Sequence, residues 1–332
     1  MANFNIRGMG TYIPEYVLTN EELSNIVDTN DEWITKRVGI KERRISQGES
    51  TWYMGKCAAL QALDHAKMKP EDIDMIIATT ATPDFFYPSL SCLVQKEIKA
   101  VNAFCFDLTA GCSGFIYAAD VAEKYLRTGE YKNILIVCSE CLSAVTDYTD
   151  RSTCVLFGDG AGACVVSSVG DGKMLASHLA SEGEGGFSLY GKAITNHSPF
   201  VKPEIAEKYN EFPDCNDYFL KMDGPEVYKF ATRAMVHACQ KVCEKAGITI
   251  DDVDYVIPHQ ANERIIDFAV KRLKLNPEKA VKTIRQYGNT SSASNLLCFD
   301  SLIKQGKPQK GDKVIFTAFG AGLTYGAFLL EW

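Results

Sequence analysis

Short apolar runs alternate with longer helix-like stretches along most of this chain. The runs at 71–80 (EDIDMIIATT) and 131–140 (YKNILIVCSE) have the length and the aliphatic content of buried strands. The stretches at 55–68 and 113–130, which precede these runs, are instead typical of helices. Strands and helices that alternate in this way predict an α/β fold with buried sheets.

The same succession of patterns occurs twice, at an offset of 180 residues. DDVDYVIPHQ at 251–260 repeats the acidic lead-in and the apolar run of 71–80, and GDKVIFTAFG at 311–320 stands at the same offset from 131–140. Helix-like stretches again come before these runs, at 231–247 and 291–307. A chance coincidence of common patterns is the alternative, but repeated order at one offset favours an internal duplication.

The repeat predicts two halves, at 1–170 and 171–332. With 332 residues, of which 46% are hydrophobic, the chain can bury a substantial core. An irregular stretch at 186–221, which contains several Tyr, Phe and Pro residues, interrupts the second half. Loops of this length inside a domain are usually functional, so we hypothesise that 186–221 covers the entrance to a site.

Charge and cysteine content narrow the class of protein. The net charge of −7 argues against a nucleic-acid partner, although it leaves room for a local basic patch. No signal peptide and no apolar run of membrane-spanning length is evident, so we expect a cytoplasmic protein with no membrane contact. The 12 cysteines are then thiols, and the C-x-x-C pair Cys138 and Cys141 predicts two core thiols rather than a metal site.

Cys112 stands out because it lies between a strand-like run and a helix-like stretch, in DLTAGCSGF (107–115). The positive end of a helix dipole lowers a thiol pKa, so this position predicts a nucleophile. His259 ends the repeated strand YVIPHQ, and Asn289 lies in the turn of the second half that corresponds to the Cys112 turn. Since open α/β sheets gather ligands at strand ends, these three residues are candidate catalytic residues.

Each of these residues also has a purely structural interpretation. A single cysteine is usually part of a core, a single histidine is often a buried structural group, and an asparagine before threonine is often a turn residue. A cysteine hydrolase would share the order Cys, His, Asn, but the papain-type surroundings are absent. A carrier-binding partner without activity would be expected to lack the nucleophile, which is present here.

Motifs over nearly the whole chain resemble the β-ketoacyl-acyl-carrier-protein synthase III family, condensing enzymes of the thiolase superfamily. The motifs are TNDEWITKRVGIKERR (29–44), DLTAGCSGF, TDRSTCVLFGDGAGA (149–163), PHQANERII (258–266), YGNTSSAS (287–294) and FGAGLTYG (319–326). The resemblance implies a duplicated thiolase-like α/β fold of five layers, α/β/α/β/α, in a homodimer. It also implies an acyltransferase that needs no permanently bound cofactor.

The resemblance assigns a role to each catalytic candidate. Cys112 would take an acyl group from acyl-CoA, and malonyl-acyl carrier protein would then lose carbon dioxide and attack the acyl-cysteine, which begins fatty-acid synthesis. His259 and Asn289 would stabilise the enolate by hydrogen bonds. The backbone N–H groups of Cys112 and Ala321 would bind the second oxyanion, and Ala321 stands where many relatives have glycine.

The resemblance also implies contacts for the substrates. Trp33 and Arg151 would enclose the CoA adenine, Arg37 would contact the nucleotide phosphates, and Asn262 would contact the pantetheine. Tyr87 would reach the partner's acyl pocket and favour a short primer such as acetyl. Acidic acyl carrier protein would dock on four basic residues, Lys229, Arg264, Lys271 and Arg272. Of these, Arg264 and Lys271 are seven positions apart and share one helix face.

Three departures from the family pattern bear on specificity. Pro225 replaces a polar residue that usually helps to hold the pantetheine, so one hydrogen-bond donor should be missing. Ser152 stands where glycine is usual, and the stretch 186–221 is longer than in compact members. The alternative function is that of a related condensing enzyme or acyl-CoA:acceptor transferase of secondary metabolism, of polyketide or quinolone type.

Overall fold

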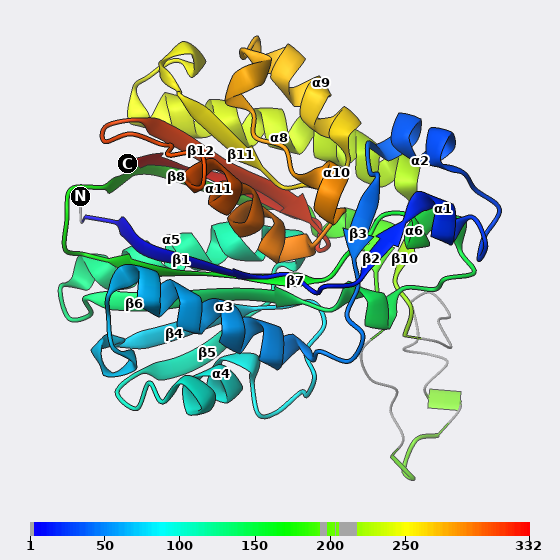
Figure 1. Cartoon of the computed structure of the whole chain (residues 1–332), viewed down its shortest axis with the longest axis horizontal. Helices are drawn as coiled ribbons and strands as arrows, with labels where there is room; N and C mark the ends of the chain where they lie inside the picture. The colour runs from blue at the N-terminus through cyan, green and yellow to red at the C-terminus, as the bar shows by residue number, and fades with distance from the viewer. Residues whose placement is uncertain (1–2, 193–197, 203, 206–217) are drawn as a thin grey trace.

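A computed structural model describes residues 3–192, 198–202, 204–205 and 218–332. Two large sheets and three layers of helices build most of the molecule, with the helices between and outside these sheets (Figure 1). In the part of the chain that is described, no helix is long and apolar enough to cross a membrane. Much of the predicted loop 186–221 lies outside the described residues.

The first sheet has five strands in the order β1-β7-β6-β4-β5. They are β1 (Asn5–Tyr12), β7 (Gly160–Ser167), β6 (Asn133–Glu140), β4 (Met75–Thr79) and β5 (Phe104–Leu108). The pairs β1 with β7 and β7 with β6 are antiparallel, whereas β4 pairs in parallel with both β6 and β5. The strand β4 is buried throughout, as expected of a strand covered on both faces.

The second sheet repeats this arrangement with four strands. They are β8 (Lys173–Ser181), β13 (Thr324–Glu331), β12 (Lys313–Gly320) and β11 (Tyr255–Pro258), and in this order they match β1-β7-β6-β4, including the antiparallel and parallel pairings. The positions that correspond to β5 form a short helix instead, α10 (Ile284–Tyr287). The first sheet therefore has one strand more than the second.

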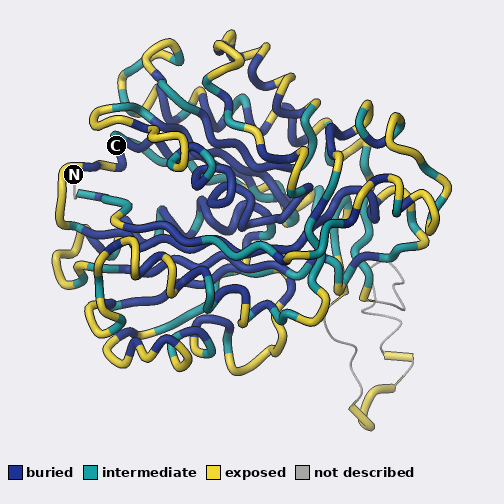
Figure 2. The backbone as a smooth tube through the Cα atoms, in the orientation of Figure 1, coloured by how far each residue is buried: buried dark blue, intermediate teal, exposed yellow. Residues whose placement is uncertain are grey.

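Five layers result, and each interface between layers is apolar. The outer helices α3 (Thr51–Ala66) and α4 (Leu90–Ile98) cover one face of the first sheet, and α8 (Gly224–Ala246) and α9 (Glu263–Leu273) cover one face of the second. Between the sheets lie α5 (Gly114–Thr128) and α11 (Ser294–Ile303), whose core is built from both halves of the chain. Figure 2 shows this buried centre and the exposed outer rim. The predicted thiolase-like α/β fold is confirmed.

Local contacts repeat at the 180-residue offset as well. In the 3-10 turns η1 (Pro70–Asp72) and η5 (Ile250–Asp252), the last aspartate accepts the backbone N–H of the residue before the turn, from Lys69 and from Thr249, each at 2.8 Å. In each case an aspartate in front of the next strand accepts backbone N–H groups of the neighbouring strand. Asp74 accepts from Asn133 at 2.9 Å, and Asp254 accepts from Lys313 at 2.8 Å. The acidic residues that precede the repeated strands, and that reveal the repeat, thus connect neighbouring strands by hydrogen bonds. The division at 170 and 171 itself stays a prediction.

Most of the remaining elements build a cap beside the two large sheets. Its apolar residues form a separate cluster around Ile34, Ile40 and Leu156. The cap elements and short segments are β2 (Val17–Thr19), α1 (Asn20–Leu23), α2 (Asp31–Val38), β3 (Glu42–Arg44), α6 (Arg151–Cys154), η3 (Leu142–Val145), η4 (Gly183–Ser188), β9 (Leu189–Tyr190) and β10 (Lys221–Met222). The turn η6 (Pro277–Lys279) instead follows α9 beside the second sheet.

Candidate active site

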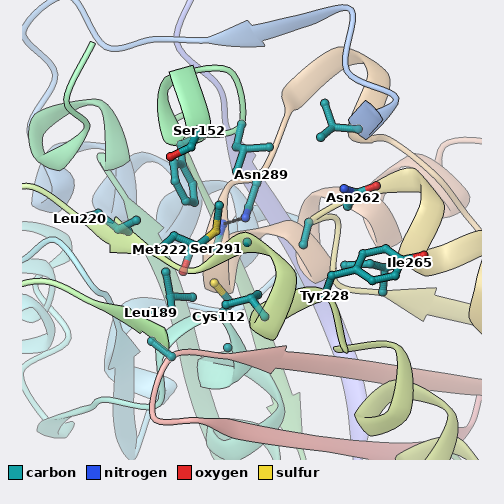
Figure 3. A pocket seen from close by; sticks show the side chains of 18 of the residues that line it. Cys112, Ser152, Leu189, Leu220, Met222, Tyr228, Asn262, Ile265, Asn289 and Ser291 are labelled. Atoms are coloured by element: carbon teal, nitrogen blue, oxygen red, sulfur yellow. Dashed lines mark hydrogen bonds between the residues drawn. The ribbon is translucent and has the colours of Figure 1, made fainter. Parts of the chain in front are cut away.

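One cavity of about 940 Å³ joins the centre of the molecule to its cap. Cys112, His259 and Asn289 all line it, as do Trp33 and Arg37. Figure 3 shows Cys112, Asn289 and Ser291 close to one another in this cavity. The structure therefore brings the three catalytic candidates together, although they are far apart in the sequence.

Cys112 lies in the turn η2 (Gly111–Ser113), between β5 and the first residue of α5. This is the strand-to-helix turn that the sequence predicts. Gly111 adopts a φ of +51°, a left-handed conformation that favours glycine. Hydrogen bonds fix the turn to the second half: Ser113 Oγ donates to the carbonyl oxygen of Thr324 at 3.1 Å, and Thr324 Oγ1 donates to that of Ala110 at 2.9 Å.

The backbone at Gly320 and Ala321 packs directly against the Cys112 turn. A Cβ added to Gly320 would lie 2.5 Å from the Cys112 nitrogen, and one added to Gly111 would lie 3.0 Å from the Ala321 nitrogen. Only glycine permits so close an approach of two backbones. The two N–H groups predicted to bind an oxyanion, those of Cys112 and Ala321, thus lie on adjoining segments, one from each half of the chain.

Burial changes the expected acidity of Cys112. The side chain is nearly enclosed, and this loss of water raises the pKa of the Cys112 thiol to about 12. The nearby carboxyl of Glu140 raises it further, whereas the hydroxyl of Ser291 acts in the opposite direction. This direction is opposite to the lowered thiol pKa that the sequence predicts, because burial disfavours the thiolate. Cys112 is therefore a thiol at neutral pH.

His259 follows β11 and is almost completely buried. Its backbone N–H donates to Thr317 at 2.8 Å, and its ring packs edge-on against Phe319 at 5.3 Å between centroids. Burial lowers the pKa of His259 to about 3, so the imidazole is neutral at neutral pH. Its Nδ1 lies 2.7 Å from Ser294 Oγ. A neutral imidazole beside a neutral thiol suits hydrogen bonding better than a standing ion pair.

Asn289 is held in an orientation that the backbone determines. Its Oδ1 accepts from the N–H of Ser291 at 2.9 Å, which identifies this atom as oxygen because a backbone N–H can only donate. The Asn289 main chain pairs with the strand-like segment beside it, accepting from Gly158 at 3.0 Å and donating to Leu156 at 2.9 Å. The amide NH₂ group of Asn289 is therefore the donor left for a ligand.

A buried carboxyl behind the turn is a feature that sequence reasoning missed. Glu140, the last residue of β6, accepts from Ala81 N–H at 2.8 Å and from Ser292 Oγ at 2.5 Å. Burial raises the pKa of Glu140, and these hydrogen bonds act against that rise. An acidic residue at the end of the apolar run ILIVCSE was the available signal. Glu140 ties the segment after Asn289 to the loop after β4.

Two arginines flank Trp33 on the cap. The guanidinium carbon of Arg151 lies 5.0 Å from the indole centroid, and that of Arg37 lies 5.5 Å from it. Arg151 also donates to the carbonyl oxygen of Asp28 at 2.8 Å. Asn262 caps α9 by accepting from Arg264 N–H at 2.9 Å, and its Nδ2 lies 3.4 Å from the carbonyl oxygen of Arg37. Of the four residues predicted to contact CoA, Trp33, Arg37 and Asn262 line the cavity, and Arg151 lies against Trp33.

The predicted docking residues lie on the outer helices α8 and α9. Arg264 lines the cavity, and its guanidinium stacks on Tyr228 at 5.5 Å. Lys271 and Arg272 are exposed in the last turn of α9, and Lys229 is exposed on α8, with Glu226 at 3.8 Å. Phe268, which the sequence analysis did not single out, is 40% exposed among them.

The residues linked to specificity fall into two groups. Tyr87 is 88% exposed and does not line the cavity of its own chain among the described residues. Pro225 and Ser152 do line it. The described ends of the stretch 186–221 also reach the cavity through apolar residues, namely Leu189, Tyr190, Leu220 and the flanking Met222 (Figure 3).

Comparisons with known proteins agree over the whole chain. The family model 3-oxoacyl-[acyl-carrier-protein] synthase III matches residues 106–183, and the model of its C-terminal part matches 243–332. The β-ketoacyl-[acyl-carrier-protein] synthase III of Clostridium acetobutylicum is 45% identical over 332 residues, which are 100% of this chain and 99% of that protein.

Solved structures give the same result. The crystal structure of 3-oxoacyl-[acyl-carrier-protein] synthase III from Aquifex aeolicus VF5 has a TM-score of 0.91 at 44% identity, covering 99% of this chain and 100% of its own. The priming β-ketosynthase from the R1128 polyketide biosynthetic pathway has a TM-score of 0.87 at 35% identity, covering 99% and 96%. This chain therefore belongs to the β-ketoacyl-[acyl-carrier-protein] synthase III family and is a condensing acyltransferase.

Proposed function

We propose that the protein joins an acyl-CoA primer to malonyl-acyl carrier protein by decarboxylative Claisen condensation, which yields a 3-oxoacyl-acyl carrier protein and initiates fatty-acid synthesis in the cytoplasm. The observation that carries this proposal is the single cavity that runs from the buried Cys112 to the half-buried Trp33 and the exposed Arg37. An acyl-CoA needs such a path, because its thioester and its nucleotide lie at opposite ends of a long pantetheine arm.

The first step transfers the acyl group to Cys112. The sulfur attacks the thioester carbonyl, the bond to CoA breaks, and the thiol proton of Cys112 leaves with the CoA sulfur. The tetrahedral oxyanion forms beside the backbone N–H groups of Cys112 and Ala321, where fixed donors can contribute several kcal/mol. Since the pKa of Cys112 is raised to about 12, proton transfer to the departing sulfur accompanies the attack.

The second step forms the carbon–carbon bond. Malonyl-acyl carrier protein loses carbon dioxide, and the resulting enolate carbon attacks the acyl carbonyl on Cys112, whose sulfur leaves and takes up a proton. Neutral His259 and the Asn289 amide donate to the enolate oxygen. A neutral imidazole can donate without giving up its proton, which prevents early quenching of the enolate.

Trp33 and Arg151 provide the adenine site in this proposal. An aromatic ring stacked between them needs about 3.5 Å on each side, or about 7 Å in all. The present separation of 5.0 Å is too short for this, so Arg151 must move away from Trp33 when adenine enters. In the same proposal Arg37, 5.5 Å from the indole centroid, contacts the nucleotide phosphates, and Asn262, which lines the cavity, contacts the pantetheine.

Arg264 links the proposed carrier-protein surface to the cavity, because it belongs to both. Acidic carrier protein would meet Lys229, Lys271 and Arg272 next to it, and charge complementarity would mainly speed encounter. We further propose a homodimer in which Tyr87 completes the partner's acyl pocket. Its high exposure and the position of β5 at the end of its sheet, as far as the chain is described, support this proposal.

The test is an intact mass measurement after incubation with acetyl-CoA, followed by addition of malonyl-acyl carrier protein. With acetyl-CoA alone, we expect the protein to gain one acetyl group, and we expect Cys112→Ala to gain none. After malonyl-acyl carrier protein is added, the acetyl group should leave the protein and 3-oxobutanoyl-acyl carrier protein should form. A protein that gains no acyl group from acetyl-CoA or longer acyl-CoAs would contradict the proposal.

A related enzyme of secondary metabolism is the second candidate. The similarity to a priming β-ketosynthase of a polyketide pathway and the apolar lining at Leu189, Leu220 and Met222 favour it. The same acyl-enzyme, offered a soluble acceptor in place of malonyl-acyl carrier protein, separates the two. Transfer only to the soluble acceptor would favour the second candidate.

A further inference from the structure

Ser294 contacts the His259 imidazole and is not among the described residues that line the cavity. It is the first residue of α11, and its side chain is 1% exposed. Its Oγ lies 2.7 Å from Nδ1 of His259 and accepts from the backbone N–H of Gln260 at 3.3 Å. The hydroxyl therefore joins the candidate catalytic histidine to the loop that follows β11.

The contact between Ser294 Oγ and His259 Nδ1 is compatible with both tautomers of the ring, since a hydroxyl can donate one hydrogen bond and accept two. The Ser294 oxygen accepts from Gln260, and among the residues that the structure describes Nδ1 is the partner to which its proton can go. When the hydroxyl donates to Nδ1, the single N–H of the neutral imidazole resides on Nε2.

The other half of the chain shows that this pair is not a general need of the fold. At the 180-residue offset, Gly114 takes the place of Ser294 and Thr79 takes that of His259. A Cβ added to Gly114 would lie 2.8 Å from both Cβ and Oγ1 of Thr79, so no serine fits there. The hydroxyl is present only in the half that presents an imidazole.

We propose that Ser294 is a positioning residue that keeps His259 in its Nε2–H form, so that Nε2 donates a hydrogen bond to the enolate oxygen. This inference rests on the proposed function. Without the hydroxyl, the proton can shift to Nδ1, and the lone pair of Nε2 would then face the developing negative charge. The condensation step should suffer, whereas acyl transfer to Cys112 should not.

The experiment compares Ser294→Ala with Ser139→Ala. Ser139 is an equally buried serine whose Oγ donates to the carbonyl oxygen of Thr51 at 2.6 Å, on β6 and away from His259. We would record ¹⁵N spectra of the His259 ring, the rate of Cys112 acetylation by intact mass, and the rate of malonyl-acyl carrier protein decarboxylation. Ser294→Cys, which is nearly isosteric, provides a second variant if the alanine variant does not fold.

In the wild type and in Ser139→Ala we expect the proton on Nε2 of His259. In Ser294→Ala we expect a mixture of both forms, decarboxylation slower by about 10- to 100-fold, and acetylation within about threefold of the wild-type rate. Ser294→Cys, a weaker donor, should fall between them.

A proton on Nδ1 in the wild type would overturn the inference, and so would unchanged decarboxylation in Ser294→Ala. An equal loss of acetylation and decarboxylation would also overturn it, because it would indicate general damage to the site. If the wild type neither acetylates nor condenses, the proposed function fails, whereas the ring spectra still decide the role of Ser294.

Discussion

The two halves of this protein contain the same turn, but only the turn of the first half carries a candidate nucleophile. In the first half Cys112 lies in η2, and in the second half Ser292 lies in η7 (Ser291–Ala293). The residues before them, Gly111 and Ser291, have φ values of +51° and +48°, so the two backbones match. Cys112 nevertheless borders the cavity, whereas Ser292 is fully buried and donates its hydroxyl to Glu140.

The difference lies in what faces each turn from the opposite half. Gly320 ends β12 and leaves room for the Cys112 backbone, while Glu140, its counterpart at the end of β6, fills the corresponding space with a carboxyl. The turn geometry alone therefore does not make a nucleophile. A nucleophile also needs the space and the hydrogen-bond donors that the facing strand end provides. This conclusion can be tested at the turn of each half.

The largest expected effect comes from moving the thiol to the other turn. Combining Cys112→Ala with Ser292→Cys should give no acyl-enzyme, a loss of at least about 1,000-fold, because position 292 is closed to the cavity and a thiol beside Glu140 resists ionisation. Intact mass after incubation with acetyl-CoA measures this. Acetylation of the cysteine at position 292 would show that the turn is sufficient.

The next effect comes from filling the space that faces Cys112. Gly320→Ala places a methyl group 2.5 Å from the Cys112 nitrogen, so the backbone must shift and the oxyanion donors separate. We expect acetylation to fall by about 100-fold, which is about 3 kcal/mol. Gly183→Ala is the control, since a Cβ there meets no atom within 4 Å. Equal rates for both variants would contradict the assignment of these donors.

The third effect is a pH dependence of stability that arises from His259. Its counterpart Thr79 cannot take up a proton and so contributes none. Burial lowers the pKa of His259 from 6.5 to about 3, so the unfolded chain binds a proton first as the pH falls. The contribution of neutral His259 to the free energy of unfolding is complete above pH 6.5 and is lost progressively as the pH falls toward 3. Between pH 6.5 and 5 the loss is about 2 kcal/mol.

Denaturant unfolding at several pH values measures that loss. His259→Gln should show a shallower decline of the free energy of unfolding over this range, whatever its level at pH 7. A decline as steep as that of the wild type would show that other groups cause it.

The last effect, similar in size to the third, tests the carboxyl behind the second turn. Glu140→Gln keeps the shape but turns an amide NH₂ toward donors, so the free energy of unfolding should fall by about 1 to 3 kcal/mol. Alkylation of Cys112 should become faster at a given pH, because the charge that raises its pKa is removed. Thermal unfolding and iodoacetamide kinetics measure the two quantities. Slower alkylation would argue against an electrostatic influence of Glu140.

Periodic features of the sequence predicted most of the fold. The runs at 71–80 and 251–260 became β4 and β11, and the runs at 131–140 and 311–320 became β6 and β12, since buried strands need continuous apolar stretches. The counterpart of β5 does not form a strand: α10 occupies its place, where the polar residues Arg285 and Gln286 stand at the positions of Cys105 and Phe106.

The candidate site was predictable as a set of residues but not as an environment. Strand ends and the family motifs located Cys112, His259 and Asn289. They could not indicate that burial raises the pKa of Cys112, because desolvation depends on all the atoms around the thiol. Glu140 and Ser294 were missed for a related reason, since their importance arises from contacts with residues more than 30 positions away.

The central layer has a consequence for how the molecule can come apart. Because α5 and α11 are covered by sheets from both halves, the apolar faces that they share would be exposed to water if the halves separated. The two repeats are therefore halves of one cooperative unit, not independent folding domains. A cut between residues 170 and 171 would yield two fragments that must assemble before either is native, and the recovery of acyl transfer would report that assembly.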